Sequence, residues 1–275
     1  MTRYGAILAY DGTAYKGFQR QPPPTATIQA AVEKAISQVA AQPASVIAAG
    51  RTDTGVHASG QVIAFDVEWK HGDDELLRAI NSQLPLDISL RELWRQEGFH
   101  PRYDALWRQY GYRIATPDAR HPLMNRYVWQ LVGERLDLER MNEAAALCLG
   151  ERDFAAFGTP PQAGSSNTVR QVYLSEWDLE SGAFGEISYF RIRGTAFLYH
   201  MVRRLVGMMA RVGRGVITPG EFEAILRSRD INRAKALAPA NGLVLEAVGY
   251  PRRQETGSQT RAVESLAIAA PEGNT

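Results

Sequence analysis

The stretch from Gly50 to Gln61 reads GRTDTGVHASGQ and lies between two apolar runs, residues 46–49 and 62–65. The second run has the β-branched content of a strand. A plain connection between two strands takes about two to five residues, so this one is long and chemically rich. Its three glycines allow the backbone to fold back or to approach a ligand closely. Asp53, at the tip, is then either a reactive carboxylate or the first residue of an Asx-type turn with Arg51 as a surface partner.

The elements around this loop follow a regular order. A strand is predicted over residues 4–10, and Thr27 is a suitable cap for a helix with apolar residues at helical spacing. After the two runs that flank the loop come a helix opened by Asp73 and Asp74 and a strand over 87–94. This β-α-β-β-α-β order is the split βαβ motif of ferredoxin-like domains.

The second half of the chain repeats the pattern. The predicted elements are a strand over 105–115, a helix over 137–149, a hairpin over 169–179 and 184–193, helices over 197–212 and 221–227, and a strand over 243–250. We therefore expect an α+β fold of two ferredoxin-like halves, residues 1–104 and 105–250. Their mainly antiparallel sheets should join around a central active-site cleft, because ligands favour such junctions. Residues 251–275 are polar and are predicted to form a disordered tail.

Composition narrows the class of protein. With 45% hydrophobic and 22% charged residues in 275, the chain reads as an ordinary globular protein. Its single cysteine, Cys148, rules out an intramolecular disulfide and a thiolate-rich metal site. The first residues lack the anatomy of a signal peptide, and the most apolar segment, 197–212, carries three arginines. These features predict a cytoplasmic protein with no membrane partner.

Positive charge is unevenly distributed, although the net charge is only +1. Residues 191–214 contain six arginines and no acidic residue, and arginine outnumbers lysine 27 to 4 in the whole chain. Arginine suits bidentate phosphate contact and base stacking. A GC-rich genome would produce the same excess, so the charge permits an RNA partner without requiring one.

A second group of reactive and aromatic residues follows the first half. Residues 99–105 read FHPRYDA, and residues 108–113 read RQYGYR on the next predicted strand. Alternation along a strand places Tyr110 and Tyr112 on one face and Arg113 on the other. Arginines interleaved with aromatic rings can form a platform for unpaired bases. Tyrosines in a sheet are also ordinary core residues, which is the interpretation we prefer for Tyr112 but not for Tyr110.

A third group lies at the start of the predicted helix over 197–212. One face of that helix forms an apolar stripe of Phe197, Met201, Leu205, Met208 and Val212. Another face is basic and holds His200, Arg204, Gly207, Arg211 and Arg214. Arg203 lies on the border, where a half-buried guanidinium needs a carboxylate partner or a route to water. His200 is expected to be structural.

These three groups resemble the motifs of the bacterial tRNA pseudouridine synthase A family. The signature Arg-Thr-Asp-x-Gly-Val-His-Ala-x-Gly-Gln-Val is matched over residues 51–62. Phe-His-x-Arg at 99–102, Arg-x-Tyr-x-Tyr at 108–112 and Phe-Leu-x-x-Met-Val-Arg at 197–203 resemble further family motifs. Weaker matches at 10–21, 167–170 and 238–243 extend the resemblance over residues 4–250. Phe18, Pro101 and residues 158–161 depart from the common pattern.

The resemblance implies a role for particular residues. Asp53 would be the catalytic carboxylate, Arg203 its ion-pair partner, and Tyr110 the ring that stacks on the target uracil and assists proton transfer. Arg102 would fill the gap left by the flipped uridine. Further tRNA contacts are implied for Arg51, Phe99, His100, Pro101, Tyr103, Asn167, Thr168, Val169 and Arg170.

The implied activity is isomerisation of uridine to pseudouridine in the anticodon stem-loop of tRNA, at positions 38 to 40. It would proceed by base flipping, need no cofactor or metal, and be carried out by a homodimer with tRNA spanning both subunits. Asp53 could attack the ribose C1′ or remove the C2′ proton, and the sequence leaves both routes open.

Two other classes of function compete with this one. A metal-dependent hydrolase could use Asp53 and His57, although a third ligand at recognisable spacing is missing. An RNA-binding module without catalysis is also compatible with ferredoxin-like halves.

Overall fold

The computed structural model describes residues 1–160, 167–182 and 185–251, and the statements below refer to these residues. The predicted disordered tail lies almost entirely outside the described residues, since only Pro251 of it is included. In the described part of the chain, no helix is both long and apolar enough to span a bilayer.

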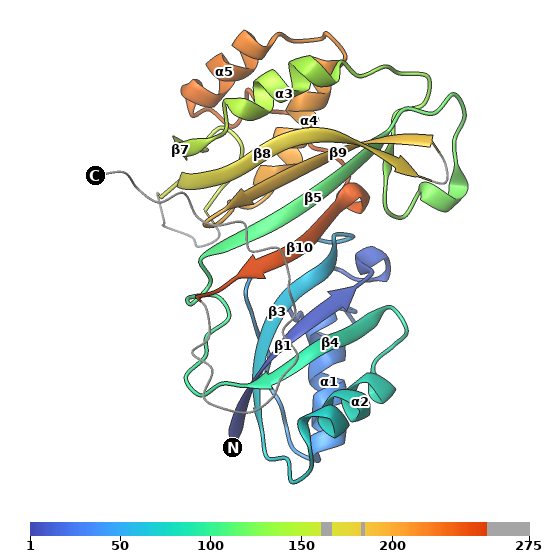
Figure 1. Cartoon of the computed structure of the whole chain (residues 1–275), viewed down its shortest axis with the longest axis vertical. Helices are drawn as coiled ribbons and strands as arrows, with labels where there is room; N and C mark the ends of the chain where they lie inside the picture. Colours follow the sequence, from blue (N-terminus) through green and yellow to red (C-terminus); the bar gives the residue numbers. More distant parts are fainter. Residues whose placement is uncertain (161–166, 183–184, 252–275) are drawn as a thin grey trace.

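One continuous twisted sheet runs through both halves of the described chain (Figure 1). The described strands follow the order β4-β1-β3-β10-β5-β9-β8-β7, with β2 paired to β3 and β6 paired to β5. All pairs are antiparallel except β10–β3 and β5–β6. The strands are β1 (Thr2–Tyr10), β2 (Ile47–Ala48), β3 (His57–Val67), β4 (Ile88–Arg95), β5 (Trp107–Ala115), β6 (Trp129–Gln130), β7 (Gly150–Asp153), β8 (Val169–Gly182), β9 (Gly185–Gly194) and β10 (Leu243–Gly249).

Helices pack against the sheet in two groups (Figure 1). The described α-helices are α1 (Ile28–Ala40), α2 (Asp73–Gln83), α3 (Leu138–Ala146), α4 (Met201–Gly213) and α5 (Pro219–Ser228), and the 3-10 turns are η1 (Gly12–Ala14), η2 (Pro122–Met124) and η3 (Ala240–Gly242). Helices α1 and α2 bury their apolar faces against β1, β3 and β4, whereas α3, α4 and α5 bury theirs against β5, β8 and β9. Tyr110 packs against both cores, so it marks their junction.

Strand β10 joins the two parts of the sheet. It pairs in parallel with β3 and antiparallel with β5. The approach to β3 is so close at Gly60 that an added Cβ atom would lie 2.0 Å from the Glu246 carbonyl oxygen. Any side chain at Gly60 would therefore push β3 and β10 apart.

The predicted elements occur in the expected order, although the short strands β6 and β7 were not predicted, and the fold is a mixed α+β fold with a mainly antiparallel sheet. Thr27 caps α1 as predicted, with its hydroxyl accepting from the Ala30 N–H at 3.4 Å. The helix predicted over 137–149 ends at Ala146, and two boundaries next to Asp53 and Arg203 differ more. Strand β3 begins at His57 rather than Val62, so the loop of Asp53 ends five residues earlier than the sequence indicates.

Helix α4 begins at Met201 instead of Phe197. Tyr199 exchanges two backbone hydrogen bonds with Thr159, which hold this segment extended. The next residue, His200, has a left-handed backbone with φ of 63°, from which a helix cannot continue. Gly207, predicted on the basic face, is buried instead: a Cβ atom there would lie 2.5 Å from the Ala236 carbonyl oxygen.

Candidate active site

The loop of Asp53 is held in place by bonds on both sides of the carboxylate. The Thr52 carbonyl accepts from the Phe18 N–H at 3.0 Å, and the Thr52 hydroxyl lies 2.7 Å from the Tyr10 hydroxyl in the core. The Asp53 carbonyl accepts from the Val56 N–H at 3.1 Å. The turn between them needs the left-handed backbone of Gly55, with φ of 78°. The segment does turn at Asp53, but the bond that closes the turn is made by the backbone carbonyl and not by the side chain, as an Asx-type turn would require; the carboxylate pairs with Arg203 instead of Arg51.

Asp53 and Arg203 form an ion pair across 150 positions of sequence. Arg203 Nη1 donates to Asp53 Oδ2 at 3.2 Å, and the two side chains are only 20% (Asp53) and 14% (Arg203) exposed. Arg203 Nε donates in turn to the Ala238 carbonyl at 2.8 Å, and the Ala238 N–H donates to the Arg203 carbonyl at 3.0 Å. The segment before β10 thus fixes the guanidinium that pairs with Asp53.

His200 also reaches the carboxylate, which the sequence did not suggest. Its Nε2 atom lies 3.4 Å from Asp53 Oδ2. Burial lowers the pKa of His200, Arg203 and Arg204 act in the same direction, and Asp53 opposes them. The imidazole is therefore neutral near neutral pH, which leaves Arg203 as the cation that balances Asp53.

Tyr110 lies on the inward face of β5, where the two cores meet. Its ring packs edge-on against Phe197, with centroids 5.2 Å apart and planes at 88°. Burial raises the pKa of Tyr110 above its usual value, and Tyr10 and Asp53 add to the effect. The phenol is therefore protonated at neutral pH. Tyr112 is a core residue, as expected, and its hydroxyl donates to the Pro239 carbonyl at 2.8 Å.

A cleft of about 880 Å³ opens at these residues. Its lining comes from both halves of the chain and includes Asp53, Arg203, His200 and Tyr110. Of the described residues that line it, six are cationic and one is acidic; the cations are Lys16, Arg51, Arg102, Arg108, Arg170 and Arg203, and the acid is Asp53. A cleft with this imbalance attracts a polyanion.

Arg108 is the first residue of the motif at 108–112, but the sequence assigned it no role, whereas the structure places it at the cleft. It is 9% exposed, and its guanidinium donates to four backbone carbonyls, those of Ala49 (3.1 Å), Arg102 (2.7 Å), Ala105 (3.3 Å) and Thr195 (2.8 Å). These carbonyls belong to the segments that carry Asp53, Arg102 and Phe197. The sequence could have indicated this burial. Residues 108, 110 and 112 are spaced by two along one strand, so Arg108 lies on the same, core-facing side as Tyr110 and Tyr112.

The loop around Arg102 divides into inward and outward residues. Phe99 is buried and packs its ring against Tyr250, and Pro101 is also buried, so both support the loop instead of facing the cleft. His100 Nδ1 accepts from the N–H groups of Arg102 and Tyr103, each at 3.2 Å. His100, Arg102 and Tyr103 line the cleft, as does the exposed Arg51.

The segment 167–170 contributes one residue to the cleft, Arg170. Burial lowers the pKa of Arg170, and its Nη1 donates to the Asn167 and Val169 carbonyls. The Thr168 hydroxyl donates to Asp153 at 2.6 Å, which ties it to β7. Asn167, Thr168 and Val169 are not among the residues that line the cleft.

Both ring nitrogens of His57 are used in structural contacts. Its Nε2 donates to the Arg126 carbonyl at 2.9 Å, while Nδ1 lies 3.0 Å from the Gly12 nitrogen. The hydrolase alternative therefore loses the second ligand on which it depended. Within the described ranges, no three His, Cys, Asp or Glu side chains are grouped so that they could hold a metal ion.

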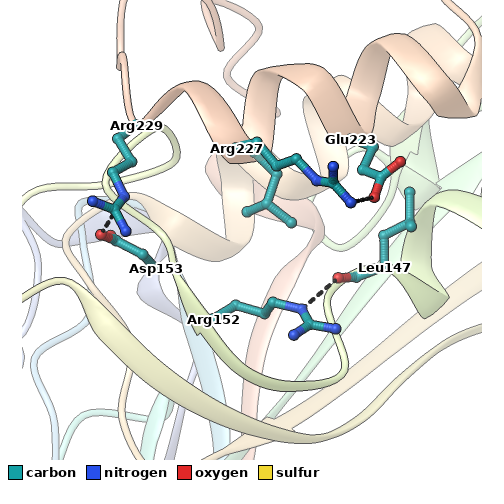
Figure 2. Close-up of a pocket in the computed structure, with 7 residues that line it drawn as sticks. Leu147, Arg152, Asp153, Glu223, Arg227 and Arg229 are labelled. Carbon is teal, nitrogen blue, oxygen red and sulfur yellow. Dashed lines mark hydrogen bonds and ion pairs between the residues drawn. The ribbon is translucent and has the colours of Figure 1, made fainter.

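A second hollow, of about 480 Å³, lies between β7 and α5 (Figure 2). Arg229 pairs with Asp153 at 2.9 Å and Arg227 with Glu223 at 2.6 Å. Arg152 donates to the Leu147 carbonyl at 3.4 Å. Acidic partners neutralise two of these three arginines, so this hollow lacks the excess of positive charge found in the cleft.

Comparison with known proteins identifies the family of this chain. A family model described as tRNA pseudouridine synthase matches residues 6–104 and 144–251. The tRNA pseudouridine synthase A of Paraburkholderia phymatum is 36% identical over 276 residues, covering 99% of this chain and 95% of that protein. The enzyme of the same name from Neisseria meningitidis serogroup B is 36% identical (90% and 92% covered), and that of Pseudothermotoga lettingae 37% (91% and 100% covered).

The matched ranges contain Asp53, Arg102 and Arg203, and the ion pair joins the first matched range to the second. The chain belongs to the tRNA pseudouridine synthase family, and it is an isomerase that converts uridine to pseudouridine in tRNA.

Proposed function

We propose that the uridine isomerised by this enzyme lies in the anticodon stem-loop, at positions 38 to 40, and that Asp53 is the catalytic carboxylate. One observation carries the assignment of Asp53: it is the single acidic residue on the described lining of a cleft with six cations. A carboxylate in such a place is surrounded by groups that attract the RNA backbone. Arg203 and His200 both lie within hydrogen-bonding or ion-pairing distance of its Oδ2 atom, at 3.2 and 3.4 Å.

The reaction breaks the N1–C1′ bond of uridine, turns the base, and joins C5 to C1′. Asp53 either attacks C1′, as the nucleophile of a retaining glycosidase does, or removes the C2′ proton. Both routes use the ionised carboxylate close to the sugar. Arg203 is the positioning residue for it, because its guanidinium is itself fixed by the Ala238 carbonyl.

Tyr110 and Arg102 act on the base and on the gap that it leaves. Tyr110 offers a ring face to the uracil and, being protonated, a phenolic O–H near the reacting atoms. Because the phenol already holds a proton, it would take up the C5 proton only while passing its own proton to water, and the label would leave by that route. Flipping a nucleotide out of its stack costs roughly a few kcal/mol. Arg102 would offset part of this cost by filling the vacated position.

We further propose that Arg51, His100, Tyr103 and Arg170 contact tRNA from the cleft walls, with Phe99, Pro101 and the segment 167–169 supporting them. The division into ferredoxin-like halves at 1–104 and 105–250 is supported by the two separate helix-on-sheet cores. Assembly as a homodimer with tRNA spanning both subunits is part of the same proposal, and rests on the family resemblance.

Release of tritium from uracil C5 tests the proposed target. Anticodon-arm transcripts labelled at C5 should release tritium with the wild-type enzyme, because C5 loses its proton when it bonds to C1′. Replacing the uridines at positions 38, 39 and 40 by cytidine, one at a time and together, should remove the corresponding share of release. Full release from the triple replacement would place the target at another uridine of the anticodon arm.

The Tyr110→Phe substitution should separate binding of the base from proton transfer. Phenylalanine keeps the ring, so tRNA binding should change less than about threefold, whereas C5 tritium release should slow by about 10²-fold or more because a proton-transfer group is lost. The measurement is single-turnover tritium release beside a filter-binding titration.

The pH profile provides the control for Tyr110. Since its pKa is raised in the folded enzyme, the phenol should stay protonated from about pH 6 to about pH 9. The wild-type rate should therefore show no step assignable to Tyr110 in that range. A step that disappears in Tyr110→Phe would contradict the role of a protonated phenol.

A further inference from the structure

Two exposed tyrosines stand on the cleft walls, each stacked on a histidine. Tyr103 is 75% exposed and lies on His100, with ring centroids 4.2 Å apart and planes at 29°. Tyr199 is 53% exposed and lies on His200, with centroids 3.7 Å apart and planes at 28°. All four residues line the cleft. The first pair comes from the loop after β4, and the second from the segment before α4.

The backbone that carries the Tyr199 pair is anchored by hydrogen bonds and close packing. The Tyr199 N–H donates to the Thr159 carbonyl at 2.9 Å, and the Thr159 N–H donates back at 3.4 Å. Gly158 packs so closely that a Cβ atom there would lie 2.7 Å from the Tyr199 carbonyl oxygen. The left-handed backbone of His200 sets the imidazole against the tyrosine ring. A ring ordered in advance loses little entropy when a second ring stacks on it.

The chemistry around Tyr199 selects a nucleobase. One face of its ring is covered by an imidazole, while much of the ring remains exposed in a cleft that attracts a polyanion. RNA-binding proteins use such rings as stacking platforms for unpaired bases, because every base has a π-face. An apolar ligand would gain nothing from the surrounding guanidinium groups.

The position of Tyr199 indicates which base. His200 bridges the two sites, since its ring stacks on Tyr199 and its Nε2 lies 3.4 Å from Asp53 Oδ2. Tyr199 is therefore one side chain away from the carboxylate that acts on the target ribose. A base that stacks there belongs to a nucleotide adjacent to the target, not to a distant part of the tRNA.

We propose that Tyr199 is a base-binding residue that stacks on the nucleotide next to the flipped uridine. This inference rests on the proposed function, with Asp53 at the target ribose. Tyr199 would hold the neighbouring nucleotide in place while the uridine turns.

A binding cycle with an abasic RNA tests the proposal. The protein variants are wild type and Tyr199→Ala, and the RNAs are an intact anticodon arm and arms in which the base on the 5′ or the 3′ side of the target uridine is missing. With intact RNA, Tyr199→Ala should raise Kd about tenfold, the usual size of a base–aromatic stack. With one of the two abasic RNAs the variant should bind as the wild type does, because the partner of the ring is already absent. Equal effects of Tyr199→Ala on all three RNAs would overturn the proposal.

Aromatic replacements of Tyr199 distinguish stacking from a contact of the hydroxyl group. Tyr199→Phe and Tyr199→Trp keep an aromatic ring and should retain wild-type affinity. Tyr173, on β8, is also 53% exposed but does not line the cleft, so Tyr173→Ala should leave Kd unchanged. Comparable weakening by Tyr173→Ala, or by Tyr199→Phe, would also overturn the proposal.

The proposed function has its own readout in the same experiment. If wild-type protein releases no tritium from the anticodon arm, the proposed target fails. If it does release tritium while Tyr199→Ala binds intact RNA as well as wild type, only the stacking role fails.

Discussion

The Asp53→Asn variant should bind anticodon-arm RNA with wild-type affinity and release tritium from C5 at least about 10³-fold more slowly, as expected when a catalytic carboxylate is lost. Asparagine has nearly the same size and keeps an oxygen that can accept from Arg203. It cannot serve as an anionic nucleophile or as a base toward the C2′ proton. The measurement is single-turnover tritium release at saturating enzyme, so that weaker binding cannot be mistaken for slower chemistry.

A matched substitution controls for the change of charge. Asp178 is an exposed carboxylate on β8, away from the cleft, and Asp178→Asn should keep the wild-type rate. Folding of Asp53→Asn is checked by thermal unfolding, where the midpoint should move by no more than a few degrees. Release at more than about one tenth of the wild-type rate by Asp53→Asn would remove Asp53 from the mechanism.

The second large effect is expected for the substitution Arg108→Met, which should lower both the stability of the fold and the enzymatic activity. Methionine fills much of the same volume but leaves four carbonyls without the donor that now satisfies them. A buried carbonyl left unpaired costs about 1–3 kcal/mol; the bond to Ala49 is buried, and water can recover part of the loss at the other three, which are partly buried. We expect Arg108→Met to lower the free energy of unfolding by about 3–5 kcal/mol and the midpoint by about 10 °C. Differential scanning calorimetry measures both.

The activity of Arg108→Met, tested well below its unfolding midpoint, should also fall. Its guanidinium ties together the segments that carry Asp53, Arg102 and Phe197, so losing it loosens the cleft from three sides. Arg108→Lys keeps the charge but has fewer donors and no planar fork, and it should recover only part of the stability.

The same strand supplies a control for Arg108. Arg113 lies on the opposite face of β5, partly exposed and paired with Glu180. Its partners Glu180 and Glu246 are partly exposed, and it stacks on the Tyr189 ring instead of holding a set of backbone carbonyls. Arg113→Met should therefore cost clearly less than Arg108→Met. Equal losses from the two substitutions would mean that the buried network around Arg108 has no special weight.

Local patterns predicted the elements of this fold well. Helical spacing behind Thr27 and behind Asp73 identified α1 and α2, and alternation along 107–115 separated the core residue Tyr112 from Arg113 on the other face. These features depend on neighbours within a few positions of sequence, which is the range that periodicity and capping describe.

Boundaries set by distant partners were predicted less well. Residues 197–200 have good helical spacing, yet their pairing with Thr159 keeps them outside α4. His57 reads as part of a catalytic loop, yet it begins β3 and bonds the Arg126 carbonyl. In both cases a contact with a segment far along the chain outweighed the local preference.

The motifs at 51–62, 99–112 and 197–203 were enough to identify the family, whereas the order of strands and helices was predicted from periodicity and capping. Motifs are strings of neighbouring residues, so they can be read without coordinates. The assembly of the site, in contrast, emerged only from the folded chain: β10 lies against β3 because Gly60 leaves room for it, Arg108 gathers four carbonyls, and His200 stands between Tyr199 and Asp53. Each of these arrangements depends on burial and distance between residues far apart in the chain, and neither quantity is encoded in local spacing.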